Sequence, residues 1–443
     1  LHGTLTDGQV VVDAGDDDLV RLVLDDVDIT NSTGAALAVA NASKAIVVVA
    51  DGTANALADG SPYVFDDPDS DEPNATLFST ADLTITGEGK LTVDGADNDA
   101  IASKDGLVID SATIVATAAD DAIRGKDYLV VNSGTITATS GDEGLKSDND
   151  EDEGMGYVAV NGGEVHLDAG GKGISATANA VVAGGELAVE ATDDAVHSNA
   201  NVTISGGTLE LASADDAVHG DATLTVTGGD TTVTESYEGL ESAVITIADG
   251  TIDITSSDDG INVAGGNDGS GGGPGGQMGP GGGRDSFTAP GGGSGGGSGS
   301  SDYQLVIEGG TITVDADGDG LDANGTITMT GGDVTVQGPT SEGNGALDYD
   351  GGFELSGGRL LAVGSAGMAQ SPDASGQGVV STRFDGTIAA GTIVEVVDPS
   401  GETLASLETT KAIASLVFSS PDLVAGSTYE IVLDGSSAGS VTA

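Results

Sequence analysis

Cysteine and tryptophan are absent from this chain of 443 residues, and aromatic residues make up only 3% of it. Without cysteine, the chain forms no disulfide bond and has no thiol nucleophile. Lysine and arginine are also scarce, with 12 residues against 72 aspartates and glutamates, which gives a net charge of −60. Because nucleic-acid binding depends on lysine and arginine contacts to phosphate groups, we expect no nucleic-acid partner.

Long apolar runs are missing as well. No run approaches the ~20 residues of a membrane span, so we expect no membrane insertion. No signal peptide is present at Leu1, and we expect that a leader was removed or not included. The chain is rich instead in glycine, with 74 residues, and in aliphatic residues, and its mean hydropathy is +0.03. A disordered acidic chain lacks such aliphatic residues, so the composition predicts a folded protein with an acidic surface.

Short runs of alternating apolar residues recur along most of the chain with a period of about 22 residues. In the unit from Val202 to Gly220, two alternating strands flank Gly206-Gly207, and a third short strand follows Asp215-Asp216. Alternation buries one face of each strand, and glycine supplies the positive φ that a tight corner requires. The runs begin at Leu22, Ile46, Leu83, Leu107, Leu129, Val158, Ala180, Val202, Leu224, Ile245, Leu305, Ile327 and Phe353.

Three strands per repeat, without a helical pattern between them, predict an all-β fold. We expect a right-handed parallel β-helix, a solenoid of about 13 coils. The β-helix should span residues 1–376, with insertions at 61–75 and 148–156 and a Gly/Ser/Pro-rich loop at 265–301. Residues 377–443 should form a C-terminal β cap, because an uncovered last coil would expose a strand edge that invites pairing.

Equivalent positions of successive coils stack in a β-helix, and one corner position of the repeat is mostly acidic. Carboxylates ~5 Å apart repel each other by roughly 1 kcal/mol in water and by more in a drier setting. Bound cations, protonation, or side chains that splay outward into solvent would each relieve this repulsion. Calcium is the simplest cation for the task, because it takes about 6–8 oxygen ligands. The corner position reads Asp99, Asp121, Glu143, Lys172, Asp194, Asp216, Glu238, Asp259, Asp319 and Asn344.

The segment from Asp315 to Asn324 is the strongest candidate for a calcium site. Its aspartates alternate with glycines as in the first half of an EF-hand loop, although no glutamate stands at the twelfth position. Neighbouring coils and other paired corners supply further oxygen atoms. A solvated acidic edge without metal is the alternative for the column as a whole. The predicted calcium ligands are Asp317, Asp319, Asp322, Asp348, Asp350, Asp258, Asp259, Asn262, Asp215, Asp216, Asp193 and Asp194.

A second column, three residues past the acidic corner (four at Asp348), is basic in one part of the chain. It reads Ala102, Arg124, Lys146, Ser175, His197, His219, Glu241, Asn262, Asp322 and Asp348. Such a stripe fits sugar hydroxyls or uronate carboxylates. The alternative is charge pairing between this column and the acidic column beside it. The predicted carbohydrate-binding residues are Arg124, Lys146, His197, His219 and, as an aromatic at a corner, Tyr237.

An enzyme is the less favoured interpretation of these columns. Arg124 or Lys146 beside Asp121 and Glu143 fits a calcium-dependent lyase of uronate polymers, and paired acids fit a polygalacturonase. A catalytic site should depart from the repeat, however, and these acids recur at the same position in coil after coil. We therefore expect no catalysis, and a structural or adhesive surface solenoid remains a further alternative.

Five stretches near the end of the repeat resemble one known family. They are Asp317–Gly325, Met329–Thr340, Asn344–Asp350, Ser356–Gly358 and Gly364–Gln370. These stretches are similar to the bacterial extracellular carbohydrate-binding parallel β-helix family, typified by a clostridial protein that binds cellulose and pectin-like sugars. The resemblance extends from about residue 22 to residue 373.

The resemblance implies a right-handed β-helix that holds calcium ions at its coil corners. It also implies a secreted or cell-surface location and a polysaccharide partner, cellulose or an acidic glycan, without a need for catalysis. Carried onto this chain, the implied calcium ligands are Asp317, Asp319, Asp322 and Asp348, with Asp258, Asp259 and Asn262 one coil earlier. This chain departs from the family in its acidity and in Lys172, which interrupts the acidic column. We expect a monomer.

Overall fold

The computed structural model describes residues 1–65, 71–264, 303–373 and 376–443. These residues form strands and no helix, so none of them lies in a helix long enough to cross a membrane. The chain divides into two compact units, Leu1–Ala214 and Asp215–Ala443. The predicted Gly/Ser/Pro-rich loop at 265–301 lies outside the described residues, as does part of the predicted insertion at 61–75.

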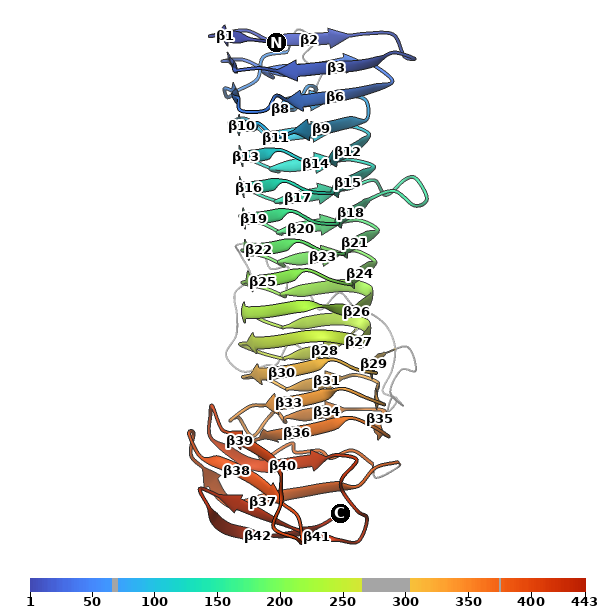
Figure 1. Cartoon of the computed structure of the whole chain (residues 1–443), viewed down its shortest axis with the longest axis vertical. Coiled ribbons are helices and arrows are strands. Elements are labelled where there is room, and N and C mark those ends of the chain that lie inside the picture. Colours follow the sequence, from blue (N-terminus) through green and yellow to red (C-terminus); the bar gives the residue numbers. More distant parts are fainter. Residues whose placement is uncertain (66–70, 265–302, 374–375) are drawn as a thin grey trace, which may run out of the picture. The chain divides into compact units, whose positions relative to one another are not determined.

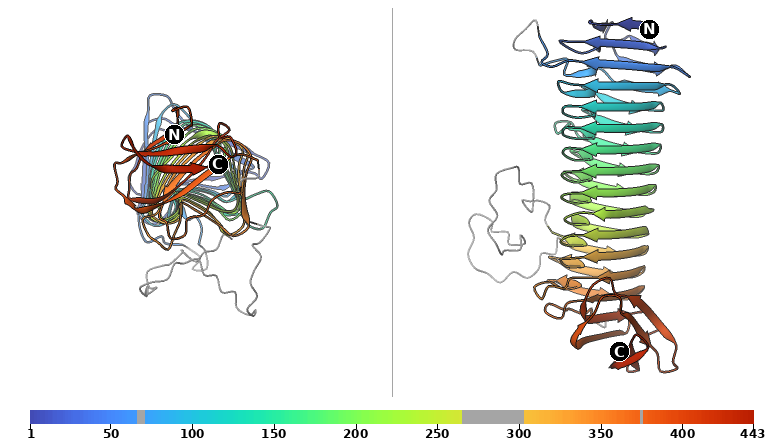
Figure 2. Two further views of the ribbon diagram at one scale, coloured as in Figure 1. Left: turned by 90° about the horizontal axis from the view of Figure 1, so that it is seen from below. Right: turned by 90° about the vertical axis from the view of Figure 1, so that its left-hand side faces the viewer.

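In the first unit, each strand pairs in parallel with the strand three places further along the chain, so that three-stranded coils stack on one another (Figure 1). Figure 2 shows the stacked coils of this unit from a second direction.

The strands of this unit form three faces. The first face contains β1 (Gly3–Leu5), β4 (Val27–Asn31), β7 (Ala54–Asp59), β10 (Lys90–Gly95), β13 (Thr113–Ala118), β16 (Thr135–Ser140), β19 (Glu164–Ala169), β22 (Glu186–Ala191) and β25 (Thr208–Ser213). The second face contains β2 (Val10–Asp13), β5 (Leu37–Asn41), β8 (Ala75–Ser79), β11 (Asp99–Ser103), β14 (Ile123–Gly125), β17 (Leu145–Ser147), β20 (Ile174–Ala176) and β23 (Val196–Ser198). The third face contains β3 (Leu19–Leu24), β6 (Lys44–Val49), β9 (Leu83–Gly87), β12 (Gly106–Ile109), β15 (Tyr128–Val131), β18 (Tyr157–Val160), β21 (Asn179–Val182) and β24 (Asn201–Ile204).

The second unit begins with two long strands, β26 (Val218–Glu235) and β27 (Leu240–Ser256), each of which passes through all three faces. Its later coils consist of separate short strands. Within this unit the second face contains β28 (Ile261–Val263), β31 (Leu321–Ala323) and β34 (Leu347–Tyr349), the third contains β29 (Gln304–Ile307), β32 (Thr326–Met329) and β35 (Gly352–Leu355), and the first contains β30 (Thr311–Ala316), β33 (Asp333–Gln337) and β36 (Arg359–Gly364).

The two units together supply about 14 turns, and the predicted all-β parallel β-helix is confirmed. Its right-handed sense remains a prediction from the repeat length. The core follows from alternation: in β13, Ile114 and Ala116 point inward and are almost fully buried, while Thr113 and Val115 face outward. Stacking repeats such contacts in every coil, and each fully buried leucine or isoleucine contributes ~1.5–3 kcal/mol.

The predicted register of the third face is correct from Leu83 onward. Leu83, Leu107 and Leu129 are partners in successive coils. At Ile46 the prediction is wrong by one residue, because Ala45 is the partner of Leu83 and Ile46 faces outward. The stretch from Ala45 to Val49 is entirely apolar, so its sequence does not reveal which residues point inward.

The parallel stacking of the second unit ends at β36. Its outer edge pairs in antiparallel fashion with β40 (Ile413–Ser419), which also pairs with β37 (Val379–Ile388). A separate antiparallel sheet has the order β39 (Thr403–Glu408), β38 (Ile393–Val397), β41 (Thr428–Leu433) and β42 (Ser436–Thr442). Phe418, Tyr429 and Ile431 belong to the apolar core of this region. The last parallel strand is therefore paired rather than open to other chains.

Candidate functional site

The acidic corner lies between the first and second faces, and its carboxylates are buried. In the first unit Asp99 is 1% exposed, Asp121 is 2% exposed and Asp194 is 3% exposed. Outward splay into solvent, one of the three arrangements considered from the sequence, therefore does not describe these side chains. Burial of carboxylates is costly unless hydrogen bonds, cations or protons compensate.

Hydrogen bonds between coils explain in part why the corner position of the repeat is mostly acidic. Asp99 Oδ1 accepts the backbone N–H of Asp121 at 3.3 Å, and Asp121 Oδ1 accepts the backbone N–H of Glu143 at 3.2 Å. Each carboxylate thus binds the corner N–H of the next coil, which lies outside the strands. Hydrogen bonds to an ionised acceptor are among the stronger ones in proteins.

Lys146, on the second-face strand β17, supplies a cation to this corner of the first unit. Its Nζ lies 3.0 Å from Asp121 Oδ2 and 2.9 Å from Glu143 Oε2. Arg124, on β14, binds both carboxylate oxygens of Asp148, at 3.2 and 2.7 Å. The two predicted carbohydrate-binding cations of the first unit are therefore engaged in ion pairs, which is the charge-pairing alternative considered from the sequence.

The next corner of the first unit is similar. Lys172 Nζ lies 2.5 Å from Asp193 Oδ1 and 2.8 Å from Asp194 Oδ2. His197, a predicted carbohydrate-binding residue, places Nδ1 2.7 Å from Asp194 Oδ2 and Nε2 2.9 Å from the side-chain oxygen of Asn199. Asp193 and Asp194 were predicted to bind calcium, and the structure places a lysine ammonium against both.

Burial and these ion pairs shift the pKa values of Asp99, Lys146 and Arg124 in the first unit. Burial raises the pKa of Asp99 to about 7, against the opposing effect of the nearby Arg124 guanidinium. For Lys146, burial favours the neutral form, but the carboxylates of Asp121 and Glu143 outweigh it and raise the pKa. The pKa of Arg124 is also raised, since the neighbouring carboxylates outweigh burial. Both side chains are therefore positively charged at neutral pH and are poor proton acceptors.

The column three residues past the acidic corner lies on the second-face strands, and we call it the second-face column. In the second unit it is mostly acidic rather than basic. Here its members are His219, Glu241, Asn262, Asp322 and Asp348, and they are direct partners in successive parallel strands. No lysine or arginine stands in this column within the described residues of the second unit. The buried corner acids of these coils therefore face further carboxylates, an amide and one imidazole.

Five side chains form what we call the buried acidic cluster: Asp216, Glu238, Glu241, Asp259 and Asn262. Each is between 0% and 3% exposed. Asn262 Nδ2 donates a hydrogen bond to Glu238 Oε2 at 2.8 Å. The Oδ1 atom of Asn262 is buried and has no hydrogen-bond partner among the described residues. An oxygen acceptor thus lies among carboxylates that cannot donate to it while ionised.

His219 borders this cluster and is the imidazole of the column. Its Nδ1 lies 2.9 Å from both Asp216 Oδ2 and Glu241 Oε2, and its Nε2 lies 3.3 Å from Asp221 Oδ1. Ligand atoms of Asp216, His219 and Glu241 lie close enough together to share one metal ion. His219 was predicted to bind carbohydrate, which stays a prediction, and the structure surrounds its imidazole with carboxylates.

Burial and like charge raise the pKa of two acids in this cluster, Asp259 and Glu238. Burial, followed by the carboxylates of Asp322, Asp319 and Asp258, raises the pKa of Asp259 to about 9. Burial also raises the pKa of Glu238 well above its ordinary value, with further contributions from Asp216, Glu241 and Asp259. Without a bound cation, protons therefore neutralise part of the cluster at neutral pH.

Several of the other predicted calcium ligands adjoin the cluster. Asp319 is buried, donates its backbone N–H to Asp259 Oδ1 at 2.6 Å and accepts the backbone N–H of Gly345. Asp322 and Asp348 are half-buried partners in adjacent strands, and Asp348 accepts a hydrogen bond from Gln370. Asp258 is half-buried beside Asp259.

The remaining predicted residues lie apart from the cluster or contribute backbone contacts. The side chain of Asp317 is 73% exposed, and its Oδ1 lies 2.9 Å from Lys411 Nζ. Asp350 is exposed. Asp215 and Tyr237 are half-buried, and the carbonyl of Asp215 accepts the N–H of Tyr237 at 2.8 Å. The segment that resembles an EF-hand loop is therefore divided, with Asp317 bound to a lysine and Asp319 buried in the corner.

Comparison with known proteins identifies the family. A family model described as carbohydrate-binding domain-containing protein matches residues 1–239, more than half of the chain. The chain belongs to this carbohydrate-binding domain-containing family. The family resemblance predicted from the sequence is thereby confirmed.

Two individual proteins are similar to this member of the carbohydrate-binding domain-containing family. A protein of the same description from Acetivibrio thermocellus is 40% identical over 118 residues, which are 27% of this chain and 41% of that relative. The chain therefore matches less than half of the relative's length. A solved structure, the gadolinium derivative of a polysaccharide lyase-like protein from C. thermocellum, is 30% identical, with a TM-score of 0.40, and covers 57% of this chain and 85% of that one.

Sequence reasoning missed three residues that the structure places at the corners of this carbohydrate-binding family member. Glu238 and Glu241 belong to the buried acidic cluster, and their signal was present, since both stand in the two columns of the repeat. Lys411 reaches Asp315 at 2.6 Å as well as Asp317, and it also donates to the carbonyl of Ala316 at 2.8 Å. No periodic signal marks Lys411, because it lies beyond the repeat.

Proposed function

We propose that this chain is an extracellular polysaccharide-binding protein without catalytic activity, in which the buried acidic cluster of the second unit holds calcium. The observation that carries the calcium assignment is the change in the second-face column. In the first unit the buried corner acids are paired with Lys146, Lys172 and, more distantly, Arg124. In the second unit the same column supplies Glu241, Asn262 and Asp322.

The donor atoms of the cluster fit calcium. Calcium takes about 6–8 oxygen ligands from carboxylates, amide or backbone carbonyls and water, whereas zinc and similar metals favour imidazole and thiolate. Glu238, Glu241, Asp259 and Asn262 offer oxygen atoms, with Asp216 beside them. The Oδ1 of Asn262, which has no hydrogen-bond partner among the described residues, is the atom that a cation would satisfy.

Protons and calcium compete for this cluster. Carboxylate ligands must be deprotonated to bind a metal, so calcium binding releases protons and strengthens as the pH rises. Because the pKa of Asp259 is raised to about 9, we expect the apparent calcium affinity to increase up to about that pH. Extracellular calcium modules work with dissociation constants of roughly 10⁻⁴–10⁻³ M, which suits a secreted or cell-surface protein.

Two features support a binding function over a lyase. Lys146 and Arg124, the candidate proton abstractors, have raised pKa values and carboxylate partners, so neither is a neutral base at neutral pH. The acids near them recur at equivalent positions in successive coils. A polysaccharide partner, cellulose or an acidic glycan, accords with membership of a carbohydrate-binding domain-containing family.

Thermal unfolding with calcium and with excess chelator, followed by glycan binding in both, tests this function. Calcium at 100 times its dissociation constant should stabilise the protein by about 2.7 kcal/mol per independent site. We expect chelation to lower Tm and wild-type protein in calcium to bind polysaccharide without releasing reducing ends or unsaturated products. An unchanged Tm would refute the calcium assignment, and product release would refute the absence of catalysis.

A further inference from the structure

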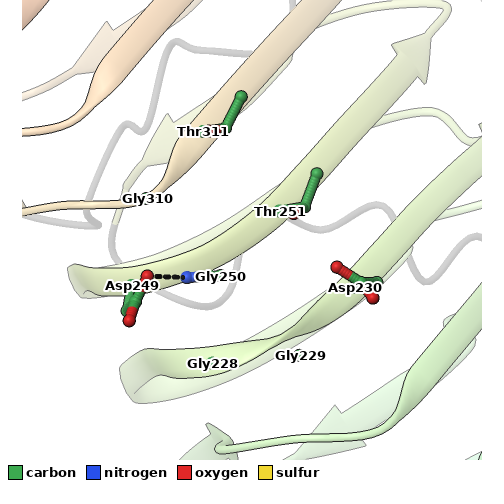
Figure 3. A pocket seen from close by; sticks show the side chains of 8 residues that line it. All are labelled: Gly228, Gly229, Asp230, Asp249, Gly250, Thr251, Gly310 and Thr311. Atoms are coloured by element: carbon green, nitrogen blue, oxygen red, sulfur yellow. Dashed lines mark hydrogen bonds between the residues drawn. The ribbon is translucent and has the colours of Figure 1, made fainter.

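A shallow groove lies at the glycine corner of the second unit, between its third and first faces. It has a volume of about 490 Å³ and crosses three successive coils, those of β26, β27 and β30. Figure 3 shows Asp230, Thr251 and Thr311 on the three neighbouring strands. These three residues are direct partners in the parallel register, so equivalent positions repeat along the groove.

Glycine makes this groove and keeps it open. Gly229, Gly250 and Gly310 have φ values of 91°, 107° and 84°, a region that residues with side chains rarely adopt. A Cβ atom on Gly250 would lie 2.9 Å from the carbonyl oxygen of Gly229, and one on Gly310 would lie 3.0 Å from that of Gly250. Since side chains cannot fill the corner, half-exposed backbone and the flanking polar side chains form its surface.

The polar groups of the groove are available to a ligand. Asp230, Thr251 and Thr311 are exposed, and their side chains make no hydrogen bond to any described residue. Asp249 Oδ1 accepts the N–H of Gly250 at 2.8 Å, which fixes the carboxylate at the rim (Figure 3). An ionised carboxylate only accepts hydrogen bonds, and a threonine hydroxyl both donates and accepts.

We infer that this groove is a subsite for a neutral, hydroxyl-rich polysaccharide strand that runs across the coils. Asp230 and Asp249 accept hydrogen bonds from sugar hydroxyls, and Thr251 and Thr311 bind neighbouring hydroxyls. No lysine or arginine lines the groove, so a uronate chain would bring its carboxylates against two others. This subsite rests on the proposed polysaccharide-binding function and narrows its ligand from a cellulose-like or acidic glycan to a neutral one.

The spacing of the coils supports a strand that crosses them. Adjacent strands lie ~4.8 Å apart, which is close to the advance per sugar of an extended β-linked glycan. Successive sugars can therefore meet Asp230, Thr251 and Thr311 in turn, because these residues stand in register. A groove that crossed strands out of register would not offer such a repeat.

Affinity electrophoresis of the full chain in gels containing hydroxyethylcellulose or polygalacturonate, with calcium present, tests this subsite. We expect wild-type protein to be retarded by hydroxyethylcellulose more than by polygalacturonate. The double variant Asp230→Ala/Asp249→Asn should bind hydroxyethylcellulose roughly tenfold more weakly, since it loses hydrogen bonds to charged acceptors. Asp253→Asn, which removes one negative charge from an exposed position of β27 outside the groove, should bind like wild type.

The possible results distinguish failure of the subsite from failure of the proposed polysaccharide-binding function. If wild-type protein binds hydroxyethylcellulose and the double variant binds it equally well, the subsite is refuted while polysaccharide binding stands. Preference for polygalacturonate would overturn the neutral ligand class. Absence of binding to either glycan would overturn the subsite together with the proposed function. Unchanged thermal unfolding of both variants would show that any loss of binding is local to the groove.

Discussion

Asp121 and Asp259 occupy the same position of the repeat and are 2% and 3% exposed, yet their surroundings differ. Lys146 Nζ lies 3.0 Å from Asp121, whereas Asp319, Asp322 and Asp258 carry the charges that act on Asp259. Burying a charge is favourable only with a partner, and without one the group takes up a proton instead. At the scale of the residue, the same side chain therefore meets a lysine in one unit, whereas in the other it takes up a proton or, as we propose, binds calcium.

The variant Asp259→Asn distinguishes protonation of this corner from calcium binding. At pH 7 we expect metal-free Tm to change little, because the amide resembles the protonated carboxyl and keeps an oxygen acceptor for the N–H of Asp319. The stabilisation by calcium, about 2.7 kcal/mol at 100 times the dissociation constant, should largely disappear. Differential scanning calorimetry with calcium and with chelator measures both quantities, and Asp253→Asn is the exposed control. Full retention of the calcium effect would exclude Asp259 as a ligand.

Asp99 should make stability depend on pH in the first unit. Its pKa is about 7 in the folded protein and ordinarily about 3.8, so the folded state holds the proton more tightly. The stability that this bound proton contributes is therefore fully present below about pH 4 and is lost as the pH rises to about 7. The free energy of unfolding should fall by at most about 1.4 kcal/mol per pH unit, which is the slope that corresponds to one proton.

Urea unfolding of Asp99→Asn between pH 4 and 8 tests this effect of one carboxyl. The variant should lose stability less steeply than wild type across this window and be the more stable of the two at pH 8. The amide oxygen can still accept the N–H of Asp121, so the corner hydrogen bond is retained. Parallel curves for the two proteins would contradict the raised pKa.

At the scale of the element, the three-residue strands of the second face carry the difference between the units. In β17 and β31 the outer residues are buried and the middle residue is half-buried. That middle position is Lys146 in β17 and Asp322 in β31. Because neighbouring strands are in register, the middle residue of one strand determines which charge the corner acid of the preceding coil meets.

Replacing Lys146 by methionine should convert a corner of the first unit into one that resembles the second. Asp121 and Glu143 would lose their shared ammonium group, and removal of one partner of a largely buried ion pair costs ~3 kcal/mol. We expect a lower Tm in chelator and partial recovery in calcium. Lys126→Met, at a half-buried lysine on the following corner, should change Tm little. A loss of stability at neutral pH that calcium leaves unaltered would show that oxygen donors alone do not make this corner a metal site.

Much of this arrangement could be predicted from the sequence. The period gave the parallel coils, and the two columns aligned Arg124 with Lys146 and Asn262 with Asp322, as the register confirms. The period could not say whether the corner carboxylates point inward or outward, because corner residues stand outside the alternation of the strands. It also could not place Lys411, whose contact with Asp317 joins positions 94 residues apart.

At the scale of the whole molecule, a net charge of −60 means that the chain has too few lysines and arginines to pair with most of its carboxylates. With 12 lysines and arginines, the chain places Arg124, Lys146 and Lys172 in successive parts of the first unit and Lys411 near the end of the second. Between them, no lysine or arginine stands in the second-face column of the described coils of the second unit. We therefore expect the two units to respond differently when calcium is removed.

Hydrogen exchange measured by mass spectrometry at pH 8, with calcium and with excess chelator, tests this difference most directly. Peptides that cover β27, β28 and β31 should exchange faster in chelator, because ionised acids then repel one another without a cation. Peptides that cover β14, β17 and β20 should be protected equally in both conditions, since Arg124, Lys146 and Lys172 remain in place. Equal protection of β27, β28 and β31 with and without calcium would contradict a calcium-stabilised second unit.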